Sequence, residues 1–349
     1  MTIEISVIGE IIPLSYGTKG NTNTGIVQRS MLLYKHDEDM RQEMLAVQFI
    51  ATCDKILKAS GLDLKIKTYG CIPVGNKKGF IEWVPGALSL SELCKSNQTN
   101  GEDSTSRLFS SDLDTSTDGP DASPAFQRCG GWCNYESLRS LRQHSRSSKL
   151  HGIGISGDNP LQEFLRSNAY DSAAPYFIKK DVMDTYVKSC AGYCVITYLL
   201  GVGDRHTDNL LLHSQGYFFH CDYSFILGQD PKTYLPMRIT TQMLDAMGGK
   251  DSDNFAKFLS LVGAAFVTLR QPSSVRILIS LLKGMIDAKI PDISRNQKPE
   301  SAIQLFYERL CLDLNDNDAV LFLEENIARS STSKLWVAVD ALHSLGKRF

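Results

Sequence analysis

The segment Gly201-Val-Gly-Asp-Arg-His-Thr-Asp-Asn-Leu-Leu-Leu212 is followed closely by Phe219-His-Cys-Asp-Tyr-Ser-Phe-Ile-Leu-Gly228. The runs Leu210–Leu212 and Tyr217–His220 flank the polar turn Ser214-Gln215-Gly216, and this pattern predicts a β-hairpin. The hairpin would return Asp222 to the loop that carries Asp204 and Asn209. The amide and carboxylate oxygens of Asn209 and Asp222 suit a hard divalent cation such as Mg²⁺.

The same loop offers groups that handle protons. Asp204 and His206 place a carboxylate and an imidazole within three residues, and either could accept or hold a proton. Arg205, between them, could pair with a phosphate or lock the loop. A base, two metal-binding oxygens and a hairpin are the parts that metal-assisted phosphoryl transfer requires. The sequence therefore predicts a phosphoryl-transfer centre with Asp204, Arg205 and His206 as its catalytic residues.

Residues 31–94 are expected to form a small sheet with one helix. Short apolar runs predict strands, and Asp39 stands where it can cap a helix whose apolar side chains recur at helical spacing. The predicted strands cover 31–35, 64–67, 71–74 and 79–84. The predicted apolar face of the helix comprises Met44, Val47, Ile50, Ile56 and Leu57.

Residues 161–349 have a mostly helical pattern, interrupted by the hairpin. The predicted helices cover 161–167, 180–200, 241–247, 251–270, 273–287, 299–311, 316–328 and 332–345. A β-rich lobe followed by a large helical lobe places the chain in the α+β class.

Two stretches lack this patterning. Residues 95–160 are serine-rich, acidic at first and basic later, with few aliphatic side chains. Such a composition buries too little apolar surface to offset the entropy of ordering, so we expect a disordered insertion between the lobes. Residues 1–30 form a weakly patterned lead-in with a divergent sequence.

Overall composition excludes several classes of protein. The 349 residues are 42% hydrophobic and 22% charged with a net charge of -2, which argues against broad electrostatic binding to nucleic acid. The nine cysteines are odd in number and follow no signal peptide, which indicates a reducing, cytosolic setting. The longest nearly uncharged apolar run, Cys190 to Val202, is shorter than the roughly 20 residues that span a bilayer. It is expected to be a buried helix end, and no transmembrane span is predicted.

The order Gly-Asp-Arg-His-x-x-Asn, followed by an Asp-Phe-Gly-like element, resembles the phosphatidylinositol 3-/4-kinase superfamily. Protein kinases carry their catalytic loop in the order His-Arg-Asp instead. Longer runs resemble the catalytic domain of the class III phosphatidylinositol 3-kinases: Asp184 to His206, Ile226 to Lys232, Met247 to Gly249 and Ile290 to Ile293. The resemblance covers about 31–94 and 161–349, and it implies a two-lobed, protein-kinase-like lipid kinase domain.

The resemblance implies roles for matching positions. Lys35 matches the strand lysine that holds ATP phosphates, and Tyr69 matches a tyrosine of the nucleotide pocket. Glu43 stands where the family usually has aspartate. Glu82 and Val84 match the linker whose backbone binds adenine.

For the catalytic loop, the family pattern makes Asn209 and Asp222 the metal ligands, with ATP and Mg²⁺ or Mn²⁺ as cofactors. Asp204 and His206 are the proton-handling pair, and which of them is the base stays open.

The activation segment, residues 222–240, bears on the choice of lipid. Lys232 and Arg238 are its only basic residues, and the multi-basic stretch of class I enzymes is absent. Extra ring phosphates would call for a cationic cluster, so the segment favours plain phosphatidylinositol, with Lys232 and Arg238 at the lipid. The implied product is phosphatidylinositol 3-phosphate, which serves endosomal trafficking and autophagy.

The resemblance also implies a location and partners. The predicted amphipathic helix 332–345 would contact the membrane, giving a cytoplasmic protein that is peripheral on endosomal or autophagic membranes. The family suggests a regulatory kinase-like subunit and a Beclin-like subunit as partners.

One alternative function remains open at this point, a catalytically weak or inactive truncated kinase that acts as a binding protein. It is favoured by residues 14–30, which contain no recognisable phosphate-binding loop. A protein kinase is disfavoured because the activation segment is class III-like.

Overall fold

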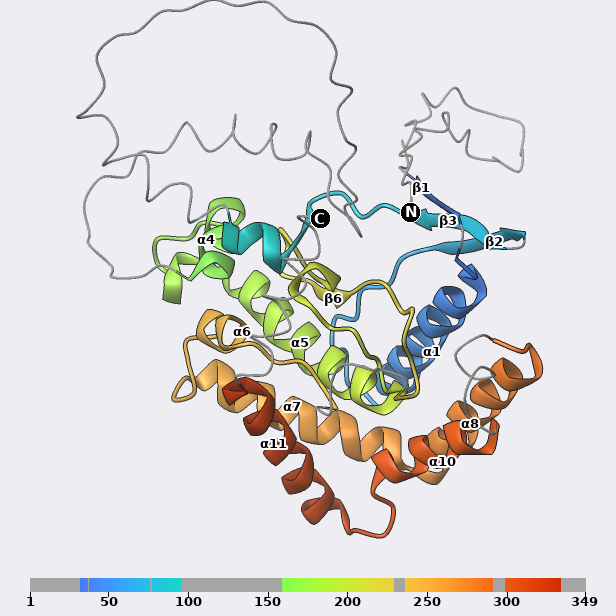
Figure 1. Ribbon diagram of the computed structural model, residues 1–349. Helices are drawn as coiled ribbons and strands as arrows, with labels where there is room; N and C mark the ends of the chain where they lie inside the picture. The colour runs from blue at the N-terminus through green and yellow to red at the C-terminus, as the bar shows by residue number, and fades with distance from the viewer. Residues whose placement is uncertain are drawn as a thin grey trace, which may run out of the picture.

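The computed structural model describes residues 32–36, 38–75, 77–95, 159–228, 236–290 and 299–333 (Figure 1). The predicted lead-in over 1–30 and Lys232 lie outside these ranges. So does nearly all of the predicted insertion over 95–160 and of the predicted helix over 332–345.

The first sheet is antiparallel and carries the predicted ATP-binding lysine. It consists of β1 (Leu32–His36), β2 (Cys71–Gly75) and β3 (Lys78–Glu82), with β3 in the centre. Successive side chains of a strand point to opposite faces. Leu33 and Lys35 are therefore turned to the same, buried face of β1. The strand itself thus directs the lysine inward.

Helix α1 (Met40–Ala59) follows directly, and its predicted cap is confirmed, since the Asp39 carboxylate accepts a hydrogen bond from the Arg41 amide at 3.1 Å. On the predicted apolar face, Ile50 and Leu57 are buried, Val47 and Ile56 are partly buried and pack against the core, and Met44 is half-buried. The side chains buried most deeply are Met40, Gln42, Glu43, Ala46, Phe49, Ile50, Cys53 and Leu57.

A second antiparallel sheet joins chain segments from both sides of the predicted insertion. It contains β4 (Ala87–Ser89), β5 (Leu210–His213) and β6 (Phe218–His220), with β5 in the centre. The predicted hairpin of β5 and β6 is confirmed. The pairing of Ser89 with Leu211 was not predicted, because β4 is too short to show an alternating pattern.

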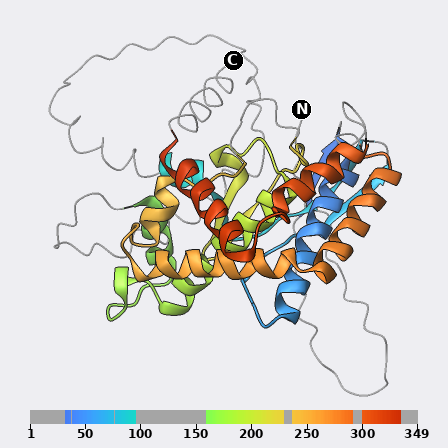
Figure 2. The ribbon, with the colours of Figure 1, turned by 90° about the horizontal axis from the view of Figure 1, so that it is seen from below.

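The remaining named elements are helical, and the predicted bounds of the α-helices agree with the structure to within a few residues, whereas the short 3₁₀ turns η1 and η2 were not predicted. They are α4 (Pro160–Asn168), η1 (Pro175–Phe177), α5 (Lys180–Leu200), η2 (Thr207–Asn209), α6 (Thr241–Ala246), α7 (Asp253–Arg270), α8 (Pro272–Asp287), α10 (Pro299–Leu310) and α11 (Asp316–Thr332). Figure 2 shows α8 and α10 beside α1, with α7 crossing the base of the molecule. The two lobes therefore share one continuous core.

Helix α5 is the centre of this core, and its end starts the predicted catalytic loop. Its residues from Ser189 to Leu200 are all buried, as predicted for an apolar run too short to span a bilayer. The helix ends at Gly201, which has a left-handed φ of 67°. A Cβ at Gly201 would lie 2.7 Å from the Gly228 amide nitrogen. Only glycine therefore lets residues 201–203 run beside residues 225–228.

The predicted strand over 64–67 is wrong. These residues pair with no strand, and Lys65 has a φ of 54°, which interrupts an extended backbone. Leu64 and Ile66 instead pack against Gly192 of α5, where a Cβ would lie 2.2 Å from Ile66. The alternation of apolar and charged residues here reflects contact with a helix.

No described helix is long and apolar enough to cross a bilayer. The seven cysteines in the described ranges have free thiols.

The β5–β6 turn offers a test of the packing. Gly216 has a φ of 87°, and a Cβ there would lie 2.2 Å from the Val182 carbonyl oxygen. Gly249 has nearly the same φ, 86°, but no atom within 4 Å of an added Cβ. Gly216→Ala is expected to lower the free energy of unfolding by about 3 kcal/mol, and Gly249→Ala by about 1 kcal/mol. Equal losses in urea unfolding would show that the backbone angle, and not the clash, sets the cost.

Candidate active site

Lys35 brings the two lobes together. Its ammonium lies 3.2 Å from the Glu38 carboxylate and 3.9 Å from the Asp222 carboxylate, and its side chain is 4% exposed. Burial opposes its charge, but Asp222, Glu43 and Glu38 outweigh that effect and raise the pKa of Lys35. The lysine is therefore a permanent cation at the junction of β1 and the segment that follows β6.

Asp222 is held as an anion in a left-handed backbone conformation, with a φ of 59°. Its carboxylate accepts hydrogen bonds from the Ser224 hydroxyl at 2.5 Å and the Ser224 amide at 3.2 Å. Burial would raise its pKa, but Lys35 and the bonds from Ser224 more than offset burial and lower the pKa of Asp222 to about 2. The side chain remains 26% exposed, so a cation can reach it.

Glu43 is a buried carboxylate that links α1 to the residue after Asp222. It accepts a hydrogen bond from the Tyr69 hydroxyl and another from the Tyr223 amide at 2.7 Å. Burial raises the pKa of Glu43, and Lys35 acts in the opposite direction. The predicted nucleotide-site pair Glu43 and Tyr69 thus forms one contact, whose immediate effect is to fix the backbone at Tyr223.

The Tyr69 hydroxyl is expected to contribute measurably to stability. Tyr69→Phe would leave the buried Glu43 carboxylate without one hydrogen-bond donor and should cost about 2 kcal/mol of unfolding free energy. Tyr34→Phe is the matched control, since no described contact involves the hydroxyl of this half-buried tyrosine. Chemical denaturation of both variants checks this, and a neutral Tyr69→Phe would contradict it.

Arg205 is a clamp on the backbone. Its side chain is buried, and its guanidinium donates to the Gly203 carbonyl at 2.7 Å, to the Cys221 carbonyl at 2.9 Å and to the Asp222 carbonyl. Of the two roles that the sequence left open, this geometry fits locking the loop. A guanidinium occupied by three carbonyls is poorly placed to hold a phosphate as well.

Asp204, His206 and Asn209 lie together at the start of the hairpin. The His206 Nε2 atom is 3.9 Å from the Asp204 carboxylate, and the His206 Nδ1 atom is 3.6 Å from the Asp208 carboxylate. Asn209 donates its amide group to the Asp204 carbonyl at 3.1 Å. This bond leaves the amide oxygen of Asn209 available as a ligand.

These contacts fit a divalent cation that arrives with a nucleotide. Among the described residues, no three His, Cys, Asp or Glu side chains cluster as a metal site. Mg²⁺ usually takes only one or two protein oxygens and completes its shell with water and substrate phosphates. The Asn209 amide oxygen and the Asp222 carboxylate suit that role.

Of the predicted linker residues, Glu82 is the last residue of β3 and Val84 lies on the connection from β3 to β4. Glu82 accepts a hydrogen bond from the Gly70 amide at 2.7 Å. Val84 is buried, and its carbonyl accepts from the Ala87 amide at 3.3 Å. Neither side chain has a described contact with Lys35 or Asp222. This position between the sheets agrees with a linker.

The structure describes only one of the two residues predicted to contact lipid. Arg238 is only 4% exposed, and Lys232 lies outside the described residues.

One residue in direct contact with the site was missed. Gln42, buried on α1, donates to the Tyr223 carbonyl at 2.9 Å and to the Ser224 carbonyl at 2.8 Å. A search for apolar periodicity passes over a glutamine. The sequence pattern that could have revealed Gln42 is its position one helical turn before Ala46 and two turns before Phe49, which places it on the buried face of the helix.

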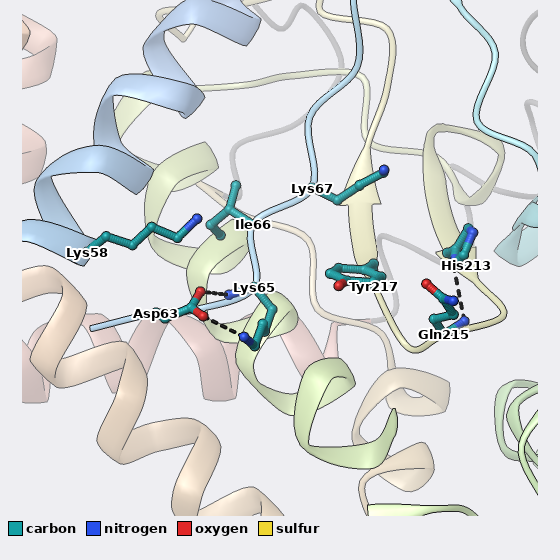
Figure 3. Close-up of a pocket in the computed structure, with 8 residues that line it drawn as sticks. All are labelled: Lys58, Asp63, Lys65, Ile66, Lys67, His213, Gln215 and Tyr217. Carbon is teal, nitrogen blue, oxygen red and sulfur yellow. Dashed lines mark hydrogen bonds and ion pairs between the residues drawn. The ribbon is translucent and has the colours of Figure 1, made fainter. Parts of the chain in front are cut away.

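Away from this centre lies a cavity of about 380 Å³, shown in Figure 3. The end of α1, residues 63–67 and the β5–β6 turn form its walls, with Lys58, Asp63, Lys65, Ile66, Lys67, His213, Gln215 and Tyr217 as lining residues. The Asp63 carboxylate is bound to the amide and ammonium of Lys65. None of the predicted site residues lines this cavity, so it is separate from the catalytic centre.

Comparison with known proteins agrees with this geometry. The sequence profile of the family described as "Phosphatidylinositol 3- and 4-kinase" matches residues 29–295. A Candida albicans protein named "Phosphatidylinositol 3-kinase VPS34" is 37% identical over 321 residues, which is 90% of this chain and 30% of that protein. Proteins of the same name from Saccharomyces cerevisiae and Arabidopsis thaliana are 32% and 30% identical, covering 93% and 89% of this chain.

The chain spans about 30% of the length of these curated relatives. Its small sheet, its large helical part and the junction between them have the α+β arrangement of a two-lobed, kinase-like lipid kinase domain. The matched profile covers most of the chain, and the chain therefore belongs to the phosphatidylinositol 3- and 4-kinase family.

Proposed function

We propose that the chain is a catalytic domain that transfers the γ-phosphate of ATP to the 3-hydroxyl of phosphatidylinositol. The observation that carries this proposal is the 3.9 Å contact between the Lys35 ammonium and the Asp222 carboxylate. It joins a phosphate-binding cation from one lobe to a metal-binding anion from the other. The names of the relatives support the lipid and the position of the hydroxyl.

Each side chain of the centre has a role in this reaction. Lys35 would hold the ATP phosphates, and Asn209 and Asp222 would hold Mg²⁺ or Mn²⁺, which would neutralise charge during phosphoryl transfer. Asp204 or His206 would accept the proton of the lipid hydroxyl, because these two groups can bind a proton and lie 3.9 Å apart in the loop that carries Asn209. Arg205 holds the backbone that carries Asp222.

We propose roles for the remaining site residues from their positions in the fold and from the family resemblance. Glu43 and Tyr69 shape the nucleotide side of Lys35, and the backbone at Glu82 and Val84 receives adenine. The proposed lipid carries no additional phosphate on its inositol ring, since Lys232 and Arg238 are the only basic residues of segment 222–240 and Arg238 is buried. A ring phosphate would need exposed cations.

The proposed organisation follows the lobes. Residues 1–30 precede an N-lobe over 31–94, an insertion occupies 95–160, and a C-lobe covers 161–349 with the catalytic loop at 201–212. We propose that the protein acts in the cytoplasm, peripherally on endosomal or autophagic membranes, with a regulatory kinase-like subunit and a Beclin-like subunit as partners.

The test is transfer of labelled γ-phosphate from ATP to phosphatidylinositol vesicles, with a generic protein substrate in parallel. Labelled phosphatidylinositol 3-phosphate that disappears on chelation with EDTA is the expected result. Label on protein alone would replace the lipid kinase with a protein kinase. No transfer, with ATP binding intact, would favour a binding protein.

A further inference from the structure

The backbone that carries Asp222 is held from two directions. The Asp222 φ of 59° is a conformation that residues other than glycine rarely adopt unless their surroundings impose it. Arg205, from the catalytic loop, binds the carbonyls of Cys221 and Asp222. The Cys221 amide donates to the Asn209 carbonyl at 3.1 Å. The first half of the segment is thus fixed by the C-lobe.

The second half is fixed by α1. The Tyr223 amide donates to Glu43 at 2.7 Å, and the carbonyls of Tyr223 and Ser224 accept from Gln42 at 2.9 and 2.8 Å. Both bonds of Gln42 come from one side-chain amide, which therefore spans two consecutive peptide groups. Gln42 is 5% exposed, so water does not readily replace it.

Asp222 thus stands at the point where the two sets of bonds meet. Loss of the Gln42 bonds would free the two peptide groups that flank Ser224, while Arg205 and Glu43 would still hold the two peptide groups that flank Asp222. The amide of Ser224 belongs to a peptide group whose carbonyl Gln42 holds, and this amide and the Ser224 hydroxyl bind the Asp222 carboxylate. The direction of the Asp222 carboxylate depends on these two bonds from Ser224.

We propose that Gln42 is a positioning residue that sets the direction of the Asp222 carboxylate through the peptide groups of Tyr223 and Ser224. This inference rests on the proposed function, in which Asp222 is a metal ligand. Gln42 makes the placement of α1 a condition for metal binding. It touches neither nucleotide nor metal in this role.

Measuring metal affinity distinguishes a positioning role of Gln42 from a role in packing alone. Gln42→Met keeps the length of the side chain and removes both donors, and Gln42→Asn keeps the donors but is one methylene too short to reach. Gln48→Met is the control, since Gln48 is exposed on the same helix. With a non-hydrolysable ATP analogue present, Mn²⁺ affinity measured by electron paramagnetic resonance should fall about 10- to 100-fold in both Gln42 variants. Binding of the analogue without metal should stay within about twofold of the unchanged chain.

Amide hydrogen exchange gives a second, ligand-free readout. The peptide that covers residues 221–225 should exchange faster in Gln42→Met and at the normal rate in Gln48→Met. Faster exchange in a chain that binds no Mn²⁺ at all would support the positioning contact while the proposed function fails. Unchanged exchange, or unchanged Mn²⁺ affinity in a chain that binds the metal, would overturn the proposal.

Discussion

Replacing Asp222 with asparagine is expected to lower kcat for phosphoryl transfer by about three orders of magnitude in a chain that stays folded. A metal ion contributes several kcal/mol to stabilising the transition state, and each 1.36 kcal/mol is about tenfold in rate. Asparagine keeps the shape of the side chain and tolerates the left-handed φ of 59°. The charge opposite Lys35 and at the metal is all that disappears.

The measurement is the initial rate of phosphatidylinositol phosphorylation at saturating Mg²⁺ and ATP, with thermal unfolding of the same samples. Asp245→Asn is the control, because Asp245 is an exposed carboxylate on α6. An Asp222→Asn variant that retains more than about a tenth of the rate would remove Asp222 from the metal site.

Arg270→Met is expected to cause the largest loss of stability, about 4 kcal/mol of unfolding free energy. The buried guanidinium donates to the Leu310 carbonyl at 2.7 Å, the Cys311 carbonyl at 2.9 Å and the Leu314 carbonyl at 2.7 Å, and it lies 2.5 Å from Asp316. Methionine fills much of the same volume but removes the guanidinium donor of all three carbonyls, of which the Cys311 carbonyl still accepts from the Leu314 amide at 3.1 Å. The connection between α10 and α11 would lose its main polar attachment to α7.

Asp316→Asn separates the ion pair from the carbonyl bonds. The Asp316 side chain is 55% exposed, so its pairing with Arg270 should contribute less than about 1 kcal/mol. Urea unfolding of both variants is the measurement. A loss from Asp316→Asn as large as that from Arg270→Met would mean that the ion pair, and not the carbonyls, holds the connection.

Much of the fold could be predicted because its elements have strong local signals. Asp39 marks the start of α1, and the apolar run of α5 ends at a glycine, so the start of α1 and both ends of α5 were found within about a residue. The strand over 64–67 was wrongly predicted, since alternation on a short segment does not reveal its partner. The pairing of β4 with β5 depends on residues far apart in the chain, which no local pattern encodes.

The site shows the same division. Asp204, Asn209 and Asp222 could be found because one loop and one hairpin bring them together, and the hairpin is readable from turn and apolar residues. The contacts of Gln42 and of Arg205 could not be found in this way. Both side chains bind backbone carbonyls, and every residue has a carbonyl, so the sequence does not show which carbonyl will be bound. The candidate catalytic and metal-binding side chains are thus easier to predict than the side chains that position them.

The pairing of β4 with β5 also has a consequence for the order of folding. Antiparallel β2 and β3 are neighbours in sequence and can pair as soon as both have been synthesised. Ser89 must wait for Leu211, and closing so long a loop costs entropy before any bond is formed. We therefore expect the linker at Glu82 and Val84 to acquire its final shape late, after the catalytic loop has left the ribosome. A nascent chain would form the strand that carries Lys35 well before the backbone proposed to bind adenine takes its final shape.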